Sequence, residues 1–185
     1  MYGIVNNAVE DLVTTKFGKS RWLKIKDRAE MAGEVFVTMR PYPDELTYRL
    51  VAAASEELAM SPDEVLFAFG EHWIQYASGQ GYGELVALAG DDIESVIRHL
   101  NDLHRRVSLS FPDIRMPFFH VTDSRPGYFR LHYRSEREGL SSFVAGLVSG
   151  LGTMFDTAIR CELILGRQHG HDHDEFDVHH EPNSA

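Results

Sequence analysis

The spacing of apolar residues changes near Ser110, and this change is the strongest constraint on the fold. Before it, apolar residues recur every three or four positions, as they do in amphipathic helices. The segment Ser61-Pro62-Asp63-Glu64 has the features of a helix start: a capping serine, a proline at the first helical position, and a glutamate three residues after the serine. Asp44 ends a proline-containing loop and is also predicted to cap a helix.

After Ser110 the sequence has the pattern of short strands separated by turns. Four segments look like strands, and they span residues 118–121, 128–135, 158–165 and 176–180. One helix is expected among them, from about Leu140 to Phe155. Helices followed by a mainly antiparallel sheet are typical of an α+β fold. The 185 residues are expected to form a single domain, residues 1–185, that is helical over about 1–110 and sheet-based over about 111–185.

The composition excludes several classes of partner. A formal net charge of −10 argues against nucleic acid, because phosphate binding needs clustered Lys and Arg. The longest apolar run, residues 143–151, is about half the length that crosses a bilayer, and the N-terminus lacks the pattern of a secretory signal. We therefore expect no membrane insertion and a cytoplasmic location. Cys161 is the only cysteine, which excludes an internal disulfide and cysteine-based zinc motifs.

His104 lies on the apolar face of the helix predicted to begin at Asp92. The stripe that it shares consists of Ile93, Val96, Ile97, Leu100, Leu103 and Val107. His99 falls off this stripe and is expected to be solvated. An imidazole on an apolar face is either a core residue bonded to a nearby carbonyl or a ligand, and neutral imidazole is a common axial ligand of haem iron. The position of His104 alone favours the core reading.

Tyr133, Ser135 and Arg137 form a second constellation. In an extended chain their side chains point to one face and span roughly 13 Å, at about 3.3 Å per residue. Two hydroxyl groups and a guanidinium suit a pair of neighbouring carboxylates, such as the two propionates of haem. The alternative is a polar sheet face with an ordinary surface pair between Arg137 and a carboxylate.

Together, and about 30 residues apart, these two features give the chain its resemblance to the haem nitric oxide/oxygen binding (H-NOX) family, which is related to the haem domain of soluble guanylate cyclase. The resemblance covers nearly the whole chain. Its further motifs are Met1-Tyr2-Gly3-Ile4-Val5-Asn6, Phe69-Gly70-Glu71-His72-Trp73, Gly81-Tyr82-Gly83-Glu84-Leu85, Asn101-Asp102-Leu103-His104, Leu109-Ser110-Phe111-Pro112 and Gly146-Leu147.

The resemblance implies a binding site for haem b (iron protoporphyrin IX) between the helical part and the sheet. It implies that His104 is the proximal iron ligand and that Tyr133, Ser135 and Arg137 hold the propionates. It also implies that Pro117 presses on the porphyrin, although this proline could simply begin a strand. Ile4 and Leu147 are expected to contact the porphyrin, and plain core packing explains each of them equally well.

The distal side of such a pocket decides which gas is bound. In oxygen-binding members of the family a distal tyrosine donates a hydrogen bond to the ligand, and the corresponding position here is Phe143, with Ser142 as the rival placement. Phe143 fits the inward stripe of its helix and Ser142 does not. A phenyl ring cannot donate, so the resemblance implies binding of NO and CO with poor O2 binding. Trp73 carries an N–H donor and is expected near the same pocket, where its alternative role is packing.

The implied activity is that of a gas sensor rather than an enzyme. Binding of NO would weaken the bond between His104 and iron. The release of His104 would then signal to a separate partner protein, which in bacterial relatives is a histidine kinase or a cyclic-di-GMP enzyme. Two alternatives stay open, an O2-binding haem sensor and a metal-binding module built on His169, His171 and His173. A haem enzyme ranks lowest, with His72 as its one candidate for acid–base chemistry.

Overall fold

The computed structural model describes residues 1–111 and 113–182, without the side chains of residues 81–83, 85, 87 and 182. Pro112, the last residue of one of the motifs above, lies outside the described residues. The elements are α1 (Gly3–Phe17), α2 (Lys19–Arg28), α3 (Asp44–Leu58), α4 (Pro62–Ala77), a π-helical turn (Ser78–Tyr82), α5 (Gly83–Ala89), α6 (Ile93–Ser108), β1 (Phe118–Arg125), β2 (Tyr128–Arg134), α7 (Ser141–Met154), β3 (Thr157–Leu165), a short 3-10 helix (Arg167–His169) and β4 (Asp174–Pro182).

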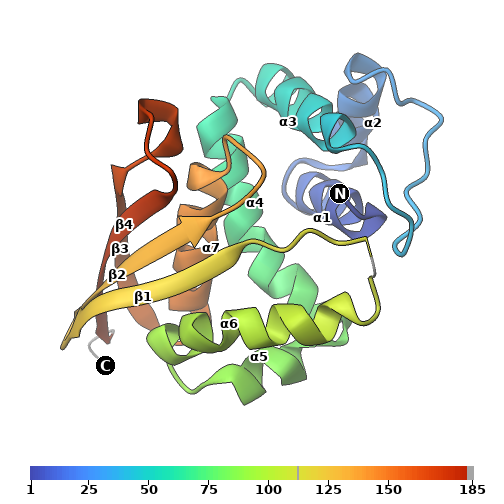
Figure 1. Cartoon of the computed structure of the whole chain (residues 1–185). Helices are drawn as coiled ribbons and strands as arrows, with labels where there is room; N and C mark the ends of the chain where they lie inside the picture. The colour runs from blue at the N-terminus through green and yellow to red at the C-terminus, as the bar shows by residue number, and fades with distance from the viewer. Residues whose placement is uncertain (112, 183–185) are drawn as a thin grey trace.

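Figure 1 shows the helical N-terminal part beside a twisted sheet, with α7 packed against the sheet and α6 running alongside β1. The sheet is antiparallel, in the order β1-β2-β4-β3. The predicted α+β architecture is therefore confirmed. None of the helices in the described part of the chain is long and apolar enough to cross a membrane.

The two faces of β2 differ in burial, as the alternation of a strand requires. Phe129, Leu131 and Tyr133 are buried on the side of α7, whereas Arg130 and His132 are partly exposed on the other side. Sheet residues of the inner face join α6 and α7 in one apolar core, and the N-terminal helices form a second core with α4. The site described below lies where these two cores meet.

Two glycines allow α4 and α7 to approach each other closely. A Cβ atom on Gly70 would lie 2.2 Å from the carbonyl oxygen of Phe143, and one on Gly146 would lie 2.1 Å from the carbonyl oxygen of Phe67. Neither contact is possible for a real side chain, so only glycine fits at these two crossings. This packing brings the aromatic face of α4 against α7 and explains, in physical terms, the glycines of two sequence motifs.

Candidate haem pocket

A cavity of about 280 Å³ opens between α1, α4, α6, α7 and the inner face of the sheet. Its walls are formed mainly by apolar side chains. All nine side chains that the sequence analysis expects in the haem site line this one cavity: Ile4, Trp73, His104, Pro117, Tyr133, Ser135, Arg137, Phe143 and Leu147. The sequence motifs thus come together from five elements and two connecting segments.

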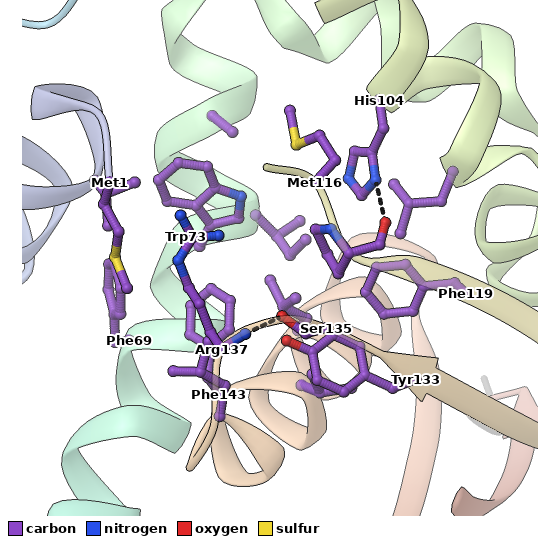
Figure 2. A pocket seen from close by; sticks show the side chains of 18 of the residues that line it. Met1, Phe69, Trp73, His104, Met116, Phe119, Tyr133, Ser135, Arg137 and Phe143 are labelled. Atoms are coloured by element: carbon purple, nitrogen blue, oxygen red, sulfur yellow. Dashed lines mark hydrogen bonds between the residues drawn. The ribbon is translucent and has the colours of Figure 1, made fainter. Parts of the chain in front are cut away.

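His104 lies in the last turns of α6 with one ring nitrogen bonded and the other without a partner. Its Nδ1 donates to the carbonyl oxygen of Pro117 at 3.3 Å. Because a carbonyl can only accept, the proton sits on Nδ1 and Nε2 carries a lone pair. Among the described residues Nε2 has no hydrogen-bond partner, and Figure 2 shows it facing the pocket. Burial lowers the pKa of His104, against the smaller opposing effect of the Pro117 bond, so the imidazole is neutral at pH 7.

Asn101 holds this helix against the sheet. Its side-chain nitrogen donates to the carbonyl oxygen of Phe119 at 2.7 Å, and its side-chain oxygen accepts from the backbone nitrogen of Phe119 at 3.0 Å. The side-chain amide of Asn101, one turn before His104 on α6, therefore satisfies both backbone groups of Phe119 on β1. The ring of Phe119 lies 5.9 Å from that of His104 and 5.2 Å from that of Tyr133, which links α6 to the middle of the pocket.

Tyr133, Ser135 and Arg137 lie at one edge of the pocket, but not on one extended strand. Strand β2 ends at Arg134, and Ser135 and Arg137 belong to the bend that follows it. The expected strand to residue 135 is therefore one residue too long, because the hydroxyl oxygen of Ser135 accepts the backbone N–H of Arg137 at 3.1 Å and turns the chain. Burial raises the pKa of Tyr133, opposed in part by a hydrogen bond with Ser135.

Asp44 is a site residue that the sequence did not reveal. Arg137 donates from Nε to Asp44 at 2.7 Å and from Nη1 to the carbonyl oxygen of Arg115 at 2.8 Å. The amino group of Met1 also bonds to Asp44. The prediction that Asp44 caps its helix is wrong, since Pro43 occupies the cap position and has no side-chain capping bond. Burial raises the pKa of Asp44, but bonds from Met1 and Arg137 outweigh it and lower the pKa below 3.8.

The wall opposite His104 is aromatic, and Figure 2 shows Trp73, Phe69 and Phe143 across the pocket from the imidazole. The rings of Phe69 and Phe143 lie 5.0 Å apart. Phe143 lines the cavity, whereas Ser142 points away and donates to Asp63 at 2.7 Å. Phe143 rather than Ser142 thus lies on the wall of this cavity. Within the described residues, the indole nitrogen of Trp73 has no hydrogen-bond partner.

A sequence model of the family described as haem-NO-binding matches residues 2–163. This chain belongs to the haem-NO-binding family. The family comprises haem-binding gas-sensor domains. An H-NOX protein from Shewanella oneidensis, solved in its Fe(II)NO state, has the same fold with a TM-score of 0.87 and 22% identity over 98% of this chain and 99% of that one. A singly mutated, unliganded Fe(II) H-NOX protein from K. algicida has a TM-score of 0.84 and 26% identity, over 99% and 98% of the two chains.

The curated proteins that this H-NOX chain is similar to include soluble guanylate cyclases. The Caenorhabditis elegans protein gcy-35 is 29% identical over 164 residues, which is 86% of this chain and 24% of that protein. The C. elegans protein gcy-31 is 24% identical over 166 residues, or 89% and 24% of the two sequences. The chain thus spans about a quarter of the length of the curated relatives that it matches.

The pocket of this H-NOX chain has the donor set that a haem requires. The flat apolar ring of haem needs apolar walls, and this cavity has them. The iron needs a neutral imidazole nitrogen that has no other partner, and Nε2 of His104 meets this requirement. Two propionates need donors at one edge, and Tyr133, Ser135 and Arg137 gather there. The residues present therefore fit the group.

The other histidines predicted to carry chemistry lie elsewhere. His72 is buried outside the cavity lining and hydrogen-bonds through Nε2 to Asp11 at 2.7 Å. His169 and His171 are exposed in the turn before β4 and do not converge with His173. His173 instead meets His132 and Glu175 on the sheet, a grouping that sequence spacing does not reveal.

Proposed function

We propose that this chain binds haem b with His104 as the proximal ligand and senses NO and CO. The observation that best supports this proposal is that Nε2 of His104 has no hydrogen-bond partner among the described residues and lies at the wall of an apolar pocket. The proposed propionate donors line the same pocket. Haem held by His104 and the propionate donors would supply an iron that can bind a diatomic gas. The domain contributes orientation, exclusion of water and the choice of ligand.

His104 is held ready for coordination by two contacts of α6. The Pro117 carbonyl fixes the tautomer, and the Asn101 amide fixes the position of the helix relative to β1. A hydrogen bond from the ring nitrogen that does not bind the metal orients a ligating imidazole and strengthens it as a donor. Pro117, Ile4 and Leu147 pack against the macrocycle in this proposal, since all three line the cavity.

The propionate edge is formed by the hydroxyl groups of Tyr133 and Ser135 and the guanidinium of Arg137. Arg137 already forms an ion pair with Asp44, which orients the guanidinium group and partly neutralises its charge. The propionates would therefore be held by the two hydroxyl groups and by a guanidinium that Asp44 orients, rather than by a free surface cation.

The ligand preference rests on Phe143. The ring that faces the pocket at this position has no hydrogen-bond donor, so a partly negative oxygen molecule receives no stabilisation from it, whereas NO and CO need little. Trp73 is the remaining N–H donor on this wall. If it reaches a bound gas, the chain is an O2 sensor instead, and the substitution Trp73→Phe would then abolish oxygen binding.

Signalling in this proposal starts with the release of His104. Helix α6 would then lose its tether to the pocket and would be held by its packing against β1, α5 and α7. A partner that binds the released form more tightly would sense the gas, because a ligand shifts an equilibrium only through differential affinity. A histidine kinase or a cyclic-di-GMP enzyme is the proposed partner class.

Absorption spectra of the ferrous protein test the assignment. We expect a Soret band that shifts under CO and under NO and stays unchanged in air on first mixing. A stable oxygenated spectrum in air would contradict the ligand preference and leave the haem assignment intact. A colourless protein that takes up no added haem would contradict the whole proposal.

A further inference from the structure

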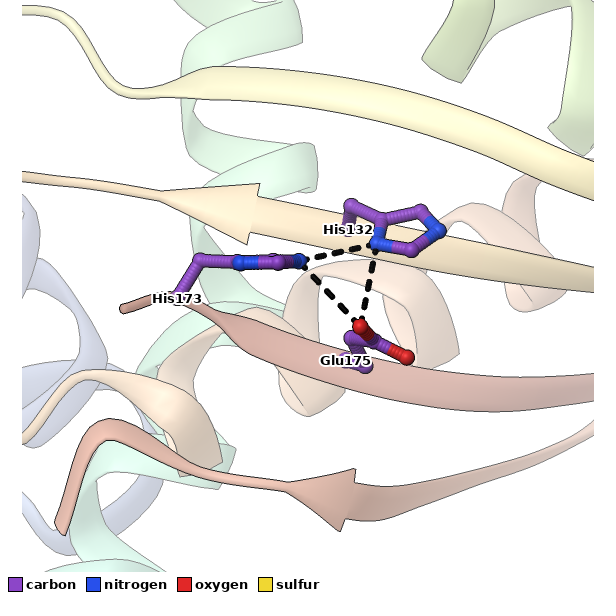
Figure 3. Close-up of side chains that lie close together, drawn as sticks. All are labelled: His132, His173 and Glu175. Atoms are coloured by element: carbon purple, nitrogen blue, oxygen red, sulfur yellow. Dashed lines mark hydrogen bonds and ion pairs between the residues drawn. The ribbon is translucent and has the colours of Figure 1, made fainter. Parts of the chain in front are cut away.

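We propose that the outer face of the sheet carries a second metal site, for Zn²⁺, formed by His132, His173 and Glu175. Figure 3 shows the three side chains converging on the solvent side of β2 and β4. Each offers one ligand atom, and these atoms lie within 4.8 Å of one another. The site is separate from the haem pocket, because His132 and its neighbour Tyr133 point to opposite faces of β2.

The distances between the ligand atoms suit a tetrahedral ion. Nδ1 of His132 lies 2.9 Å from Nε2 of His173, and Oε1 of Glu175 lies 3.6 Å and 3.3 Å from these two nitrogens. A zinc ion with bonds of about 2.0–2.1 Å separates tetrahedral ligands by about 3.3–3.4 Å. Small side-chain movements are therefore enough to admit the ion, and water fills the fourth position.

The backbone pre-organises this triangle. His132 and Glu175 are direct partners in the antiparallel register of β2 and β4, and His173 immediately precedes β4. Side chains opposite each other on one face of a sheet lie close enough to share a ligand. The exposed fractions of the three side chains, between 15% and 22%, leave an entry path from solvent.

Both histidines already have partners for their outward nitrogens. Nε2 of His132 lies 2.8 Å from the hydroxyl oxygen of Thr122, and Nδ1 of His173 lies 2.6 Å from a carboxylate oxygen of Asp172. With both outward nitrogens donating, the two inward nitrogens are free to coordinate, as in the carboxylate–histidine–zinc arrangement. The proton that the inward nitrogens share without metal is displaced to solvent when the ion binds.

The local charge also favours a cation. Glu175 and Asp172 are both carboxylates, and Arg134 is the cation in direct contact, 2.8 Å from Asp172 and 3.3 Å from Nδ1 of His173. Once the shared proton has left, both histidines are neutral and the group carries one negative charge in excess. Imidazole and carboxylate ligands select zinc and neighbouring first-row ions over Mg²⁺ and Ca²⁺.

Metal uptake by the full haem-loaded chain, prepared without a polyhistidine tag and cleared with a chelator, tests the site. We expect calorimetry and elemental analysis after dialysis to give one zinc per chain, in addition to the haem iron. His132→Ala and Glu175→Gln should lose this zinc, and Asp172→Asn should weaken it by about 10- to 100-fold. The matched control His169→Ala/His171→Ala, in the exposed turn, should keep it.

Haem content per chain and thermal unfolding show whether each variant is folded. If His132→Ala does not fold, the near-isosteric variant Glu175→Gln still tests the site. Two results would overturn the proposal. One is wild-type protein that takes up no more zinc than His132→Ala. The other is zinc that survives in His132→Ala and Glu175→Gln but is lost from the double variant of the turn.

Discussion

The backbone carbonyl of Pro117 accepts a hydrogen bond from Nδ1 of His104 across 3.3 Å. The segment that leads into β1 thus fixes the tautomer of a histidine on α6, and the nitrogen left over faces the pocket. The resemblance to the family predicts that the ring of Pro117 contacts a porphyrin. Its carbonyl has a second role that sequence reasoning missed, since backbone acceptors leave no trace in residue identity.

Phe143→Tyr is predicted to introduce oxygen binding. The new hydroxyl would stand at the aromatic wall and donate to a partly negative ligand, a bond of about 1.5–3 kcal/mol, which raises oxygen affinity roughly 10- to 100-fold. Spectra of the ferrous variant under increasing oxygen measure this effect. The matched control is Ser142→Tyr, which alters the neighbouring residue outside the cavity lining. Equal oxygen affinity in both variants would contradict the placement of Phe143.

Asn101→Ala is predicted to lower the free energy of unfolding by about 1–3 kcal/mol, because the backbone N–H and C=O of Phe119 lose their partner. The same change should speed haem loss, since α6 is less firmly held beside the pocket. Urea denaturation and haem transfer to an acceptor protein measure the two effects. Asp102→Ala, on the exposed side of α6, serves as control and should change the unfolding free energy by less than about 0.5 kcal/mol.

Much of the fold could be predicted because its elements are locally encoded. The helix start at Ser61 has the predicted capping box, and the helix that carries His104 begins after Asp92 as expected. The helix expected from about Leu140 to Phe155 spans Ser141–Met154. Hydrophobic periodicity and capping act over a few residues, so one sequence is enough to read them.

The contacts that sequence reasoning missed are long-range. Asp44 and Arg137 are 93 residues apart, and only the tertiary fold brings them within 2.7 Å. His132 meets Glu175 through a strand register that spacing cannot reveal. Histidines are closely spaced in the sequence before β4. Of His169, His171 and His173, only His173 lies in a group of potential metal ligands within the described residues. Density in sequence is therefore a poor guide to convergence in space.

Gly146→Ala is predicted to destabilise the protein by about 1–3 kcal/mol, because its Cβ would lie 2.1 Å from the Phe67 carbonyl oxygen and push α7 from α4. The loss should appear as a lower urea midpoint with an unchanged slope. Gly33→Ala is the control, since no atom lies within 4 Å of a Cβ built there. A Gly146→Ala variant as stable as Gly33→Ala would refute the close helix crossing.

The Asp44 carboxylate is predicted to contribute stability that is lost in acid. Its pKa in the folded protein lies below 3.8, so the unfolded chain binds the proton more readily. Stability from this group is therefore present above pH 3.8 and disappears as the pH falls through the lower, folded pKa. Asp44→Asn should flatten the acid side of the stability profile, measured by urea denaturation from pH 6 downwards. A parallel profile in the variant would argue against the pairing with Arg137.

The most direct test of the account is the haem content per chain of wild type, His104→Ala and His99→Ala after reconstitution with excess haem and removal of the unbound fraction. His99 is exposed on the same helix and bonded to the Ser95 carbonyl oxygen, so its loss should leave the pocket intact. We predict one haem per chain in wild type and His99→Ala, and a strongly weakened, altered Soret band in His104→Ala. Wild-type affinity and spectrum in His104→Ala would contradict the ligand assignment.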